Sequence, residues 1–377
     1  MQTINKFSHQ IAPIGARESV EMTMMPHVSS ASASEAMMQA FAGQLEHELL
    51  DLLQLPDEQT FDPRWSRVLA ELRAYAARPA KRVRPILLVA GWALTQGRAI
   101  GEVPKGVRQF AAALELLHTF MLIHDDVADG AAVRRGGPAM HTLLGRGKVG
   151  DDLAVVIGDH VYSRAIEVML SCELPAAAKA TRYMMEICRH TAVGQFLDLE
   201  LARAPIDQVT LFQTLKVAQL KTAKYGFVAP LVAGAMLGGA SAELIDALER
   251  VGRQVGLAFQ LRDDLIGLFG DDSVAGKAGG GDFVEGKRTF PLIAAWTRAD
   301  ALGRKTLEQL WNAPDKSAAQ LQLARREVER WGGRAATERV IDRMTRGARR
   351  SLTAVPAAHG ARNVLDLLMA RLAGRSA

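Results

Sequence analysis

Three aspartates, Asp125, Asp126 and Asp129, end a long apolar stretch of the sequence. In a helix, Asp125 and Asp129 would leave the same face about one turn apart. Two such carboxylates repel each other unless a cation lies between them, and oxygen ligands suit Mg²⁺, which is commonly shared with substrate phosphates. Arg134 and Arg135 follow and could hold phosphate oxygens in bidentate contacts. The alternative is a solvated acidic helix end followed by a basic loop.

A second acidic pair, Asp263 and Asp264, lies near the end of another apolar stretch that begins near Val251. Carboxylates on apolar helices are costly to bury without partners. Facing acidic pairs would therefore form a cluster for several cations, whereas unrelated pairs would be solvated helix ends.

Basic residues stand at the ends of the same predicted helices. Taken singly, each would be a surface charge, but together they suggest a cavity lined by metal ligands and phosphate-binding side chains. The glycine-rich loop around Lys277 lacks the spacing of a P-loop and follows no strand. The basic residues are Lys81, Arg84, Arg134, Arg135, Lys221, Lys277 and Lys287.

Apolar residues recur at helical spacing along most of the chain, and only 6% of residues are aromatic. The pattern predicts one all-helical domain over residues 35–377, without convincing strands, after a disordered extension over residues 1–34. The helices are expected at 35–55, 63–77, 86–95, 104–124, 150–171, 175–200, 207–220, 221–238, 241–270, 288–298, 303–312, 316–331, 333–354 and 360–373.

The net charge of +5 is spread along the chain. This favours anionic small molecules and gives little support for nucleic acid as a partner. Cys172 and Cys188 match no metal or disulfide pattern, so reduced thiols in a cytoplasmic protein are expected. We find neither a signal peptide nor an apolar stretch long enough for a transmembrane segment.

The ordered set of motifs resembles the trans-prenyltransferases, the polyprenyl (isoprenyl) diphosphate synthase family, from about residue 45 to the C-terminus. No single motif is decisive, but their order is specific. The matching segments are Lys81–Pro85, His118 with its spacing to Asp125, Asp125–Asp129, Arg134–Gly136, Gly194-Gln195 with Asp198, Lys221-Thr222, Gln260–Asp264 and Gly286–Thr289.

The resemblance implies the isoprenoid synthase fold, a single large helical bundle around a deep apolar cavity with the acidic motifs at its mouth. It implies a homodimer and three Mg²⁺ ions, with Asp125 and Asp129 holding two and Asp263 the third. Asp126, Asp264 and Lys221 complete the implied catalytic set. The residues implied to contact the allylic diphosphate are Arg134, Lys221, Lys277 and Lys287, and those implied to contact isopentenyl diphosphate are Lys81, Arg84, His118 and Arg135.

The implied chemistry is ionisation of an allylic diphosphate (dimethylallyl, geranyl or farnesyl) and attack on the cation by isopentenyl diphosphate. Thr222 and Gln260 would lie beside the allylic carbons. The family's second motif commonly ends in a third aspartate, but Gly267 holds that position here. By the family's pattern the first aspartate is the metal ligand, so loss of the last should be tolerable. The departure puts only the details of the third metal in doubt, and Asp264, Asp271 or Asp272 could contribute through water.

Phe120 precedes Asp125 by five residues, which is about 7.5 Å along a helix. A large aromatic there would act as a floor under the growing chain, as in the geranylgeranyl diphosphate synthases that this motif resembles. Met121 adds bulk beside it and could shorten the product to farnesyl diphosphate. The twenty-carbon product is the preferred prediction.

Two rival functions remain. A class I terpene cyclase would need a later metal motif of the kind that Asp159, Ser163 and Glu167 match in spacing, but these follow the first motif too soon. A non-catalytic subunit of a heteromeric synthase would usually lack acids from one motif, and both acidic motifs keep their leading aspartates here.

Overall fold

The computed structural model describes residues 30–96, 103–270, 280–314 and 316–353, with Val355 and residues 362–363 and 365–366. Most of them are helical, as predicted. The helices are α1 (Ser30–Leu52), α2 (Pro56–Gln59), α3 (Pro63–Ala76), α4 (Val83–Gln96), α5 (Lys105–Asp129), α6 (Met140–Leu144), α7 (Lys148–Ser171), α8 (Ala177–Arg203), η1 (Ile206–Gln208), α9 (Leu211–Val217), η2 (Ala218–Val228), α10 (Ala229–Leu237), α11 (Ala242–Phe269), α12 (Gly281–Val284), α13 (Phe290–Arg298), α14 (Ala301–Asn312), α15 (Ala318–Arg330) and α16 (Gly333–Thr353).

Several short elements were not predicted. Strands β1 (Val133–Arg134) and β2 (Gly137–Pro138) pair antiparallel just after the first acidic motif. Helices α2, α6 and α12 have four or five residues each. Elements this short contain too few residues for a period of two or 3.6 to be recognised.

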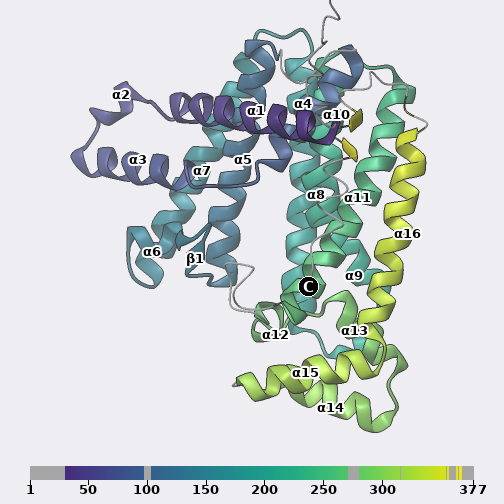
Figure 1. Cartoon of the computed structure of the whole chain (residues 1–377). Helices are drawn as coiled ribbons and strands as arrows, with labels where there is room; N and C mark the ends of the chain where they lie inside the picture. Colours follow the sequence, from purple (N-terminus) through teal and green to yellow (C-terminus); the bar gives the residue numbers. More distant parts are fainter. Residues whose placement is uncertain are drawn as a thin grey trace, which may run out of the picture.

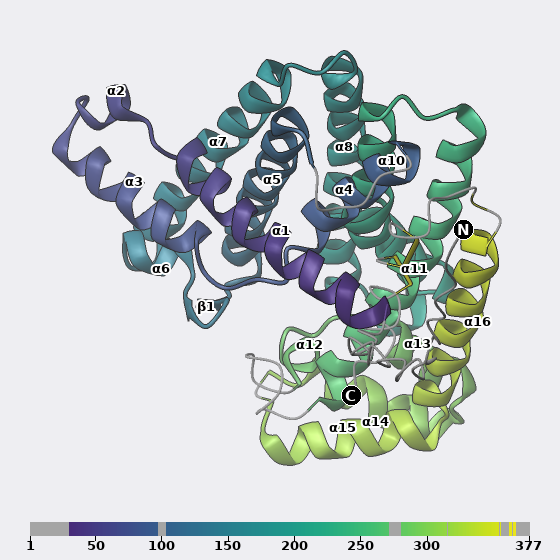
Figure 2. The ribbon, with the colours of Figure 1, turned by 45° about the horizontal axis from the view of Figure 1, so that its top comes forward.

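The long helices pack side by side in a bundle (Figure 1). Helix α5 packs against α7, α10 against α4, and α11 against both η2 and α16, while α1 lies across α5. The turned view in Figure 2 keeps the same neighbours, with α5 and α7 on one side and α11 and α16 on the other. The core between them is formed by fully buried side chains such as Leu88, Phe110, Leu114 and Val232.

A second, smaller core lies where α12 to α15 meet the end of α11, in the lower part of Figure 1. It includes Leu268, Phe283 and Trp311. Arg325 on α15 donates to the carbonyl oxygens of Leu268 at 2.7 Å and Gly270 at 2.8 Å. These hydrogen bonds hold the C-terminal end of α11, which carries the second acidic pair, against the smaller core.

The expected boundary between helices at residues 220 and 221 is wrong. Residues 211–237 form one uninterrupted helical run, α9–η2–α10, whose middle segment is a π-helix. The wide turn carries Lys221 and Thr222, and π-helical segments occur frequently at functional sites.

The N-terminal extension expected at residues 1–34 lies outside the described residues up to position 29, and α1 begins at Ser30. Most of the helix expected at 360–373 also lies outside them. None of the helices that the structure describes is long and apolar enough to cross a membrane.

Candidate active site

Residues from α5, α8, α9, η2, α11, α12 and the start of α13 meet around a polar pocket of about 250 Å³. The pocket brings together both acidic motifs and two of the predicted phosphate-binding lysines, although they are far apart in the sequence. Its charged lining residues are Asp125, Asp198, Lys221, Asp263, Asp264, Asp282, Lys287 and Arg288.

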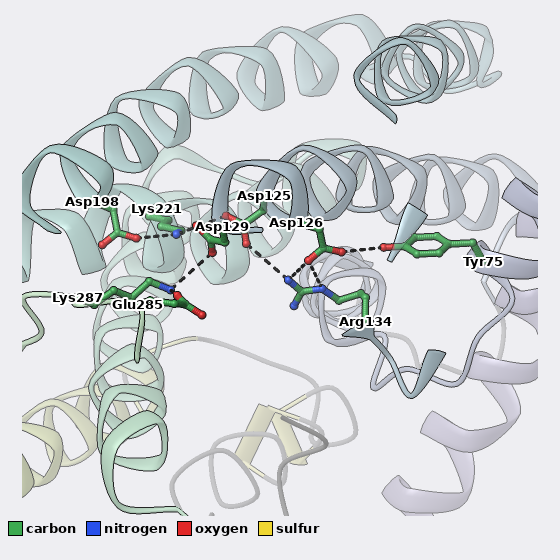
Figure 3. Close-up of polar contacts among 9 residues, drawn as sticks. All are labelled: Tyr75, Asp125, Asp126, Asp129, Arg134, Asp198, Lys221, Glu285 and Lys287. Atoms are coloured by element: carbon green, nitrogen blue, oxygen red, sulfur yellow. Dashed lines mark hydrogen bonds and ion pairs between the residues drawn. The ribbon is translucent and has the colours of Figure 1, made fainter. Parts of the chain in front are cut away.

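Lys221 joins two acids on one side of the pocket (Figure 3). Its Nζ lies 2.7 Å from a carboxylate oxygen of Asp198 on α8 and 3.5 Å from one of Asp125 on α5. Burial alone would lower the pKa of Lys221, but the two carboxylates outweigh it and raise that pKa. Lys221 is therefore a fixed cation beside the first acidic motif.

Close packing of α8 on η2 positions this contact. A Cβ added at Gly194 would overlap the backbone nitrogen of Lys221, so only glycine allows the two helices to approach here. Asp198 follows one turn later on α8 and faces Lys221. This explains the presence of both Gly194 and Asp198 in one motif.

Lys287 occupies the other side of the first motif. Its Nζ lies 3.6 Å from a carboxylate oxygen of Asp129 and also pairs with Glu285, as Figure 3 shows. Burial and the nearby Asp125 raise the pKa of Asp129. Asp125 and Asp129 are thus close enough to repel each other, as their spacing predicted. Glu285 was missed, because an isolated acid in a loop gives no sequence signal.

Asp126 has a different role from its neighbours in the motif. Its side chain is fully buried, accepts hydrogen bonds from both Nε and Nη2 of Arg134, and accepts another from the Tyr75 hydroxyl at 3.3 Å (Figure 3). Arg134 also lies 3.9 Å from Asp125. Arg134 thus forms a pair that fixes the β1–β2 hairpin to α5, and its contact with phosphate stays a prediction.

The second acidic motif is connected to η2 by a chain of hydrogen bonds. Thr222 donates to Gln260 Oε1, and Gln260 Nε2 donates to a carboxylate oxygen of Asp264 at 2.8 Å. Burial, followed by the charge of Asp282, raises the pKa of Asp264 to about 8. Asp263 lines the pocket beside them. The structure thus brings Thr222, Gln260 and the second acids together in one pocket, and the placement of Thr222 and Gln260 beside allylic carbons stays a prediction.

A separate basic subsite is built from α4, α5 and η2. Arg84 Nη1 lies 2.9 Å from His118 Nε2, and the Arg84 guanidinium stacks over the ring of Tyr225 at 5.2 Å. Burial, then the charge of Arg84, holds the pKa of His118 well below its usual value. Among the described residues, Arg84 Nε, His118 Nδ1 and the Tyr225 hydroxyl are buried atoms without a hydrogen-bond partner.

Glu115 holds two arginines at this subsite. Its Oε1 accepts from Arg82 at 2.6 Å and from Arg135 at 2.9 Å, and Glu115 itself is 1% exposed. Both arginines have positive φ, 46° and 52°, a conformation that costs energy for residues other than glycine. Glu115 was missed in the sequence, but an acid inside the apolar run of α5 implies buried cationic partners.

The remaining predicted residues have simpler placements. Lys81 is exposed in the loop before α4, whereas Lys277 lies outside the described residues, as do Asp271 and Asp272. Phe120 packs against His124 and Tyr162, with ring centroids 4.6 Å and 4.9 Å away. Met121 is also partly buried against the main core.

The acidic residues fit a hard divalent cation, because Asp125, Asp129 and Asp263 offer oxygen donors only. Among the described residues, no three Asp, Glu, His or Cys side chains converge into a complete metal site. Ions there would need further oxygen ligands, which a diphosphate can supply, as Mg²⁺ commonly requires. The donor set therefore fits cations that arrive with a phosphorylated substrate.

The alternative metal motif on α7 does not enter the pocket. The side chains of Asp159 and Glu167 are 70% and 67% exposed, and Glu167 pairs with Arg164 at 2.8 Å. The Ser163 hydroxyl donates to the backbone oxygen of Asp159. These three side chains therefore do not form the second metal site that a terpene cyclase would need.

The polyprenyl synthetase family model matches residues 66–328. A short chain isoprenyl diphosphate synthase from Methanothermobacter thermautotrophicus is 35% identical over 63% of this chain and 69% of its own. A (2E,6E)-farnesyl diphosphate synthase from Mycobacterium bovis is 33% identical over 67% of this chain and 68% of its own.

A solved geranylgeranyl pyrophosphate synthase from Corynebacterium glutamicum, complexed with isoprenyl diphosphate and magnesium, superposes with a TM-score of 0.81 at 28% identity. The match covers 90% of this chain and 99% of that one. The chain belongs to the polyprenyl synthetase family.

Proposed function

We propose that this chain is a short-chain trans-isoprenyl diphosphate synthase that condenses isopentenyl diphosphate with allylic diphosphates and releases geranylgeranyl diphosphate. The observation that supports the proposal is the presence of two separate groups of basic side chains, each of which could bind a diphosphate. One is the acidic pocket with its lysines, and the other is the partly buried subsite of Arg84, His118 and Arg135. A condensation of two diphosphates requires such a pair.

On the allylic side, Asp125, Asp129 and Asp263 would hold Mg²⁺, which would neutralise the departing diphosphate. Lys221 and Lys287 pair with carboxylates of the first motif. They are therefore fixed where negative charge develops as the C–O bond breaks, with little reorganisation required. The side chains of Thr222 and Gln260 are hydrogen-bonded to each other and line the pocket next to the second motif.

On the isopentenyl side, a bound diphosphate would accept hydrogen bonds from the buried donors that lack partners. His118 stays neutral at physiological pH, because burial and Arg84 lower its pKa. It can therefore donate through one ring nitrogen without adding positive charge. The hydrogen bond from Arg135 Nη2 to Glu115 orients the Arg135 guanidinium. Its other terminal nitrogen, Nη1, has no hydrogen-bond partner in the described part of the chain.

Three further features belong to the proposal: a third Mg²⁺, a homodimer and a cytoplasmic location. Val149 and Val156 on α7 and Phe196 on α8 are 59–63% exposed, which offers apolar surface to a second copy.

The cytoplasmic location is supported by the two cysteines. Cys172 and Cys188 are free thiols, and burial raises the pKa of Cys172 to about 11 and that of Cys188 to about 12. Such thiols suit a reducing compartment.

Farnesyl diphosphate is the alternative product, because Met121 adjoins Phe120 on the same partly buried stretch of α5. The deep apolar cavity that would hold the growing chain remains a prediction. Product length therefore depends on side chains upstream of Asp125, which substitution can test.

Chromatography of the products tests the proposal. The purified chain, with Mg²⁺ and isopentenyl diphosphate, is incubated with dimethylallyl, geranyl or farnesyl diphosphate in turn. We expect geranylgeranyl diphosphate from each starter. An allylic diphosphate alone should give no hydrocarbon, whereas its conversion would indicate a cyclase. Absence of turnover by the chain alone would indicate a non-catalytic subunit.

A further inference from the structure

Helix α16 carries a row of arginines on its exposed side. The helix contains six arginines and two acids, Glu338 and Asp342, an excess of four positive charges where the whole chain has a net charge of +5. Four of the arginines recur at steps of three and four residues, which places them on one side of the helix. All four are exposed, and they extend about 16 Å along the helix. This arginine row consists of Arg339, Arg343, Arg346 and Arg350.

The arginine row forms no ion pair within the part of the chain that the structure describes. Of the nearby acids, Glu338 pairs with Arg334 at 3.3 Å and Glu329 of α15 pairs with the same arginine at 3.7 Å. Asp342 is exposed beside the row but lies beyond ion-pair distance of it. Like charges one turn apart destabilise a helix. An anionic partner bound along the row would offset that cost.

The opposite side of α16 is packed into the bundle. Ile341, Ala348 and Leu352 are buried there, and α16 packs mainly against α11 and α13. Figures 1 and 2 both show α16 at the outer edge of the bundle, away from α3 and α7. The row is therefore held on a fixed outer surface. Because the apolar side of the helix is already buried, any contact with a membrane here would be electrostatic, without insertion into lipid.

We propose that the arginine row docks the protein on the surface of a membrane that contains anionic lipids. Arginine contacts phosphate oxygens in bidentate fashion, and a membrane surface presents many anionic headgroups in one plane. Helix α16 contains no aromatic residue on which a nucleic acid base could stack. The choice of lipid also rests on the proposed function, because the apolar tail of a twenty-carbon diphosphate favours lipid over water. Docking would release such a product beside the membrane.

Co-sedimentation of the full chain with vesicles tests the inference without a measurement of turnover. The probes are vesicles of phosphatidylcholine alone and vesicles in which part of it is replaced by phosphatidylglycerol. Each basic residue near an anionic surface contributes about fivefold to the binding constant, so we expect a preference of about 100-fold or more for the anionic vesicles. Sodium chloride should weaken this binding, because exposed charges are screened.

Charge reversal separates the row from other basic residues. Arg343→Glu/Arg346→Glu should lower the affinity for anionic vesicles by about 25-fold or more. Arg67→Glu/Lys105→Glu, at exposed positions on α3 and α5, makes the same change in net charge and is the matched control. It should bind nearly as the unaltered chain does. Thermal melting by circular dichroism confirms that each variant is folded, and Arg343→Gln/Arg346→Gln decides if the reversal variant does not fold.

Three outcomes would overturn the proposal. They are equal or absent binding of the unaltered chain to both kinds of vesicle, an equal loss of affinity in the reversal variant and its control, and tighter binding to a DNA duplex than to the anionic vesicles. The last would assign the row to nucleic acid. The proposed function would stand in each case, because product chromatography decides it separately.

Discussion

Asp125 and Asp126 are adjacent in the chain, yet their carboxylates have different surroundings (Figure 3). The Asp125 side chain is 26% exposed in the pocket and lies 3.5 Å from Lys221 Nζ. The Asp126 side chain is fully buried against Arg134 and Tyr75. One aspartate of the motif therefore faces the pocket, and its neighbour holds the hairpin that carries Arg134.

The same substitution at these neighbours should separate stability from activity. Asp126→Asn leaves the guanidinium of Arg134 without its buried partner, and we expect a loss of about 3 kcal/mol in the free energy of unfolding. Asp125→Asn should change that free energy by less than about 1 kcal/mol, while turnover falls steeply. Urea unfolding and steady-state kinetics on both variants check this, and equal stability losses would contradict it.

Lys221→Gln should lower kcat/KM by about 100-fold or more, because a fixed cation is lost where the leaving diphosphate gains charge. Lys224→Gln, in the same π-helical segment, is the control. Lys224 Nζ lies 3.3 Å from His190 Nδ1, and Lys224 does not line the pocket. Steady-state kinetics with both substrates varied measures the effect, and a similar loss in both variants would point to distortion of η2.

His118 should make the folded protein less stable in mild acid. Its pKa in the folded state lies well below 6.5, because of burial and the arginines around it. Below pH 6.5 the unfolded chain therefore binds a proton that the folded chain does not, and the free energy of unfolding falls as pH falls. The contribution of one such group approaches about 1.4 kcal/mol per pH unit.

His118→Gln should remove that contribution and flatten the fall between pH 7.5 and 5.5. His47→Gln, at an exposed position on α1, should keep the slope of the unaltered chain. Urea unfolding at several pH values gives these slopes. If the unfolding free energy of His118→Gln changes with pH as steeply as that of the unaltered chain, His118 is protonated to the same extent in the folded and unfolded states.

Phe120→Ala should lengthen the products beyond twenty carbons, because Phe120 fills space between α5 and Tyr162 of α7. Met121→Ala should do so only if Met121, and not Phe120, is the limiting side chain. Phe212→Ala, at a 74% exposed position on α9, should leave the products unchanged. Chromatography of the chain lengths decides, and an unchanged profile for both α5 variants would exclude a floor at these positions.

The sequence by itself determined the helices and the chemistry that they carry. Apolar residues at helical spacing located the long helices, because each must bury one stripe along its length. The i and i+4 placement of Asp125 and Asp129 followed directly from helical geometry. Lys221 and Lys287 were recognised from their order in the motifs.

Only the tertiary structure decided which partner each charge has. Asp126 and Asp125 are the same residue type in the same motif, and only the arrival of Arg134 and Tyr75 from other elements distinguishes them. Glu115 on α5 pairs with Arg82 and Arg135, which come from other segments. Asp282, on the four-residue helix α12, lies beside Gly267 of α11. Such contacts depend on how close distant segments come, and a one-dimensional pattern contains no such distances.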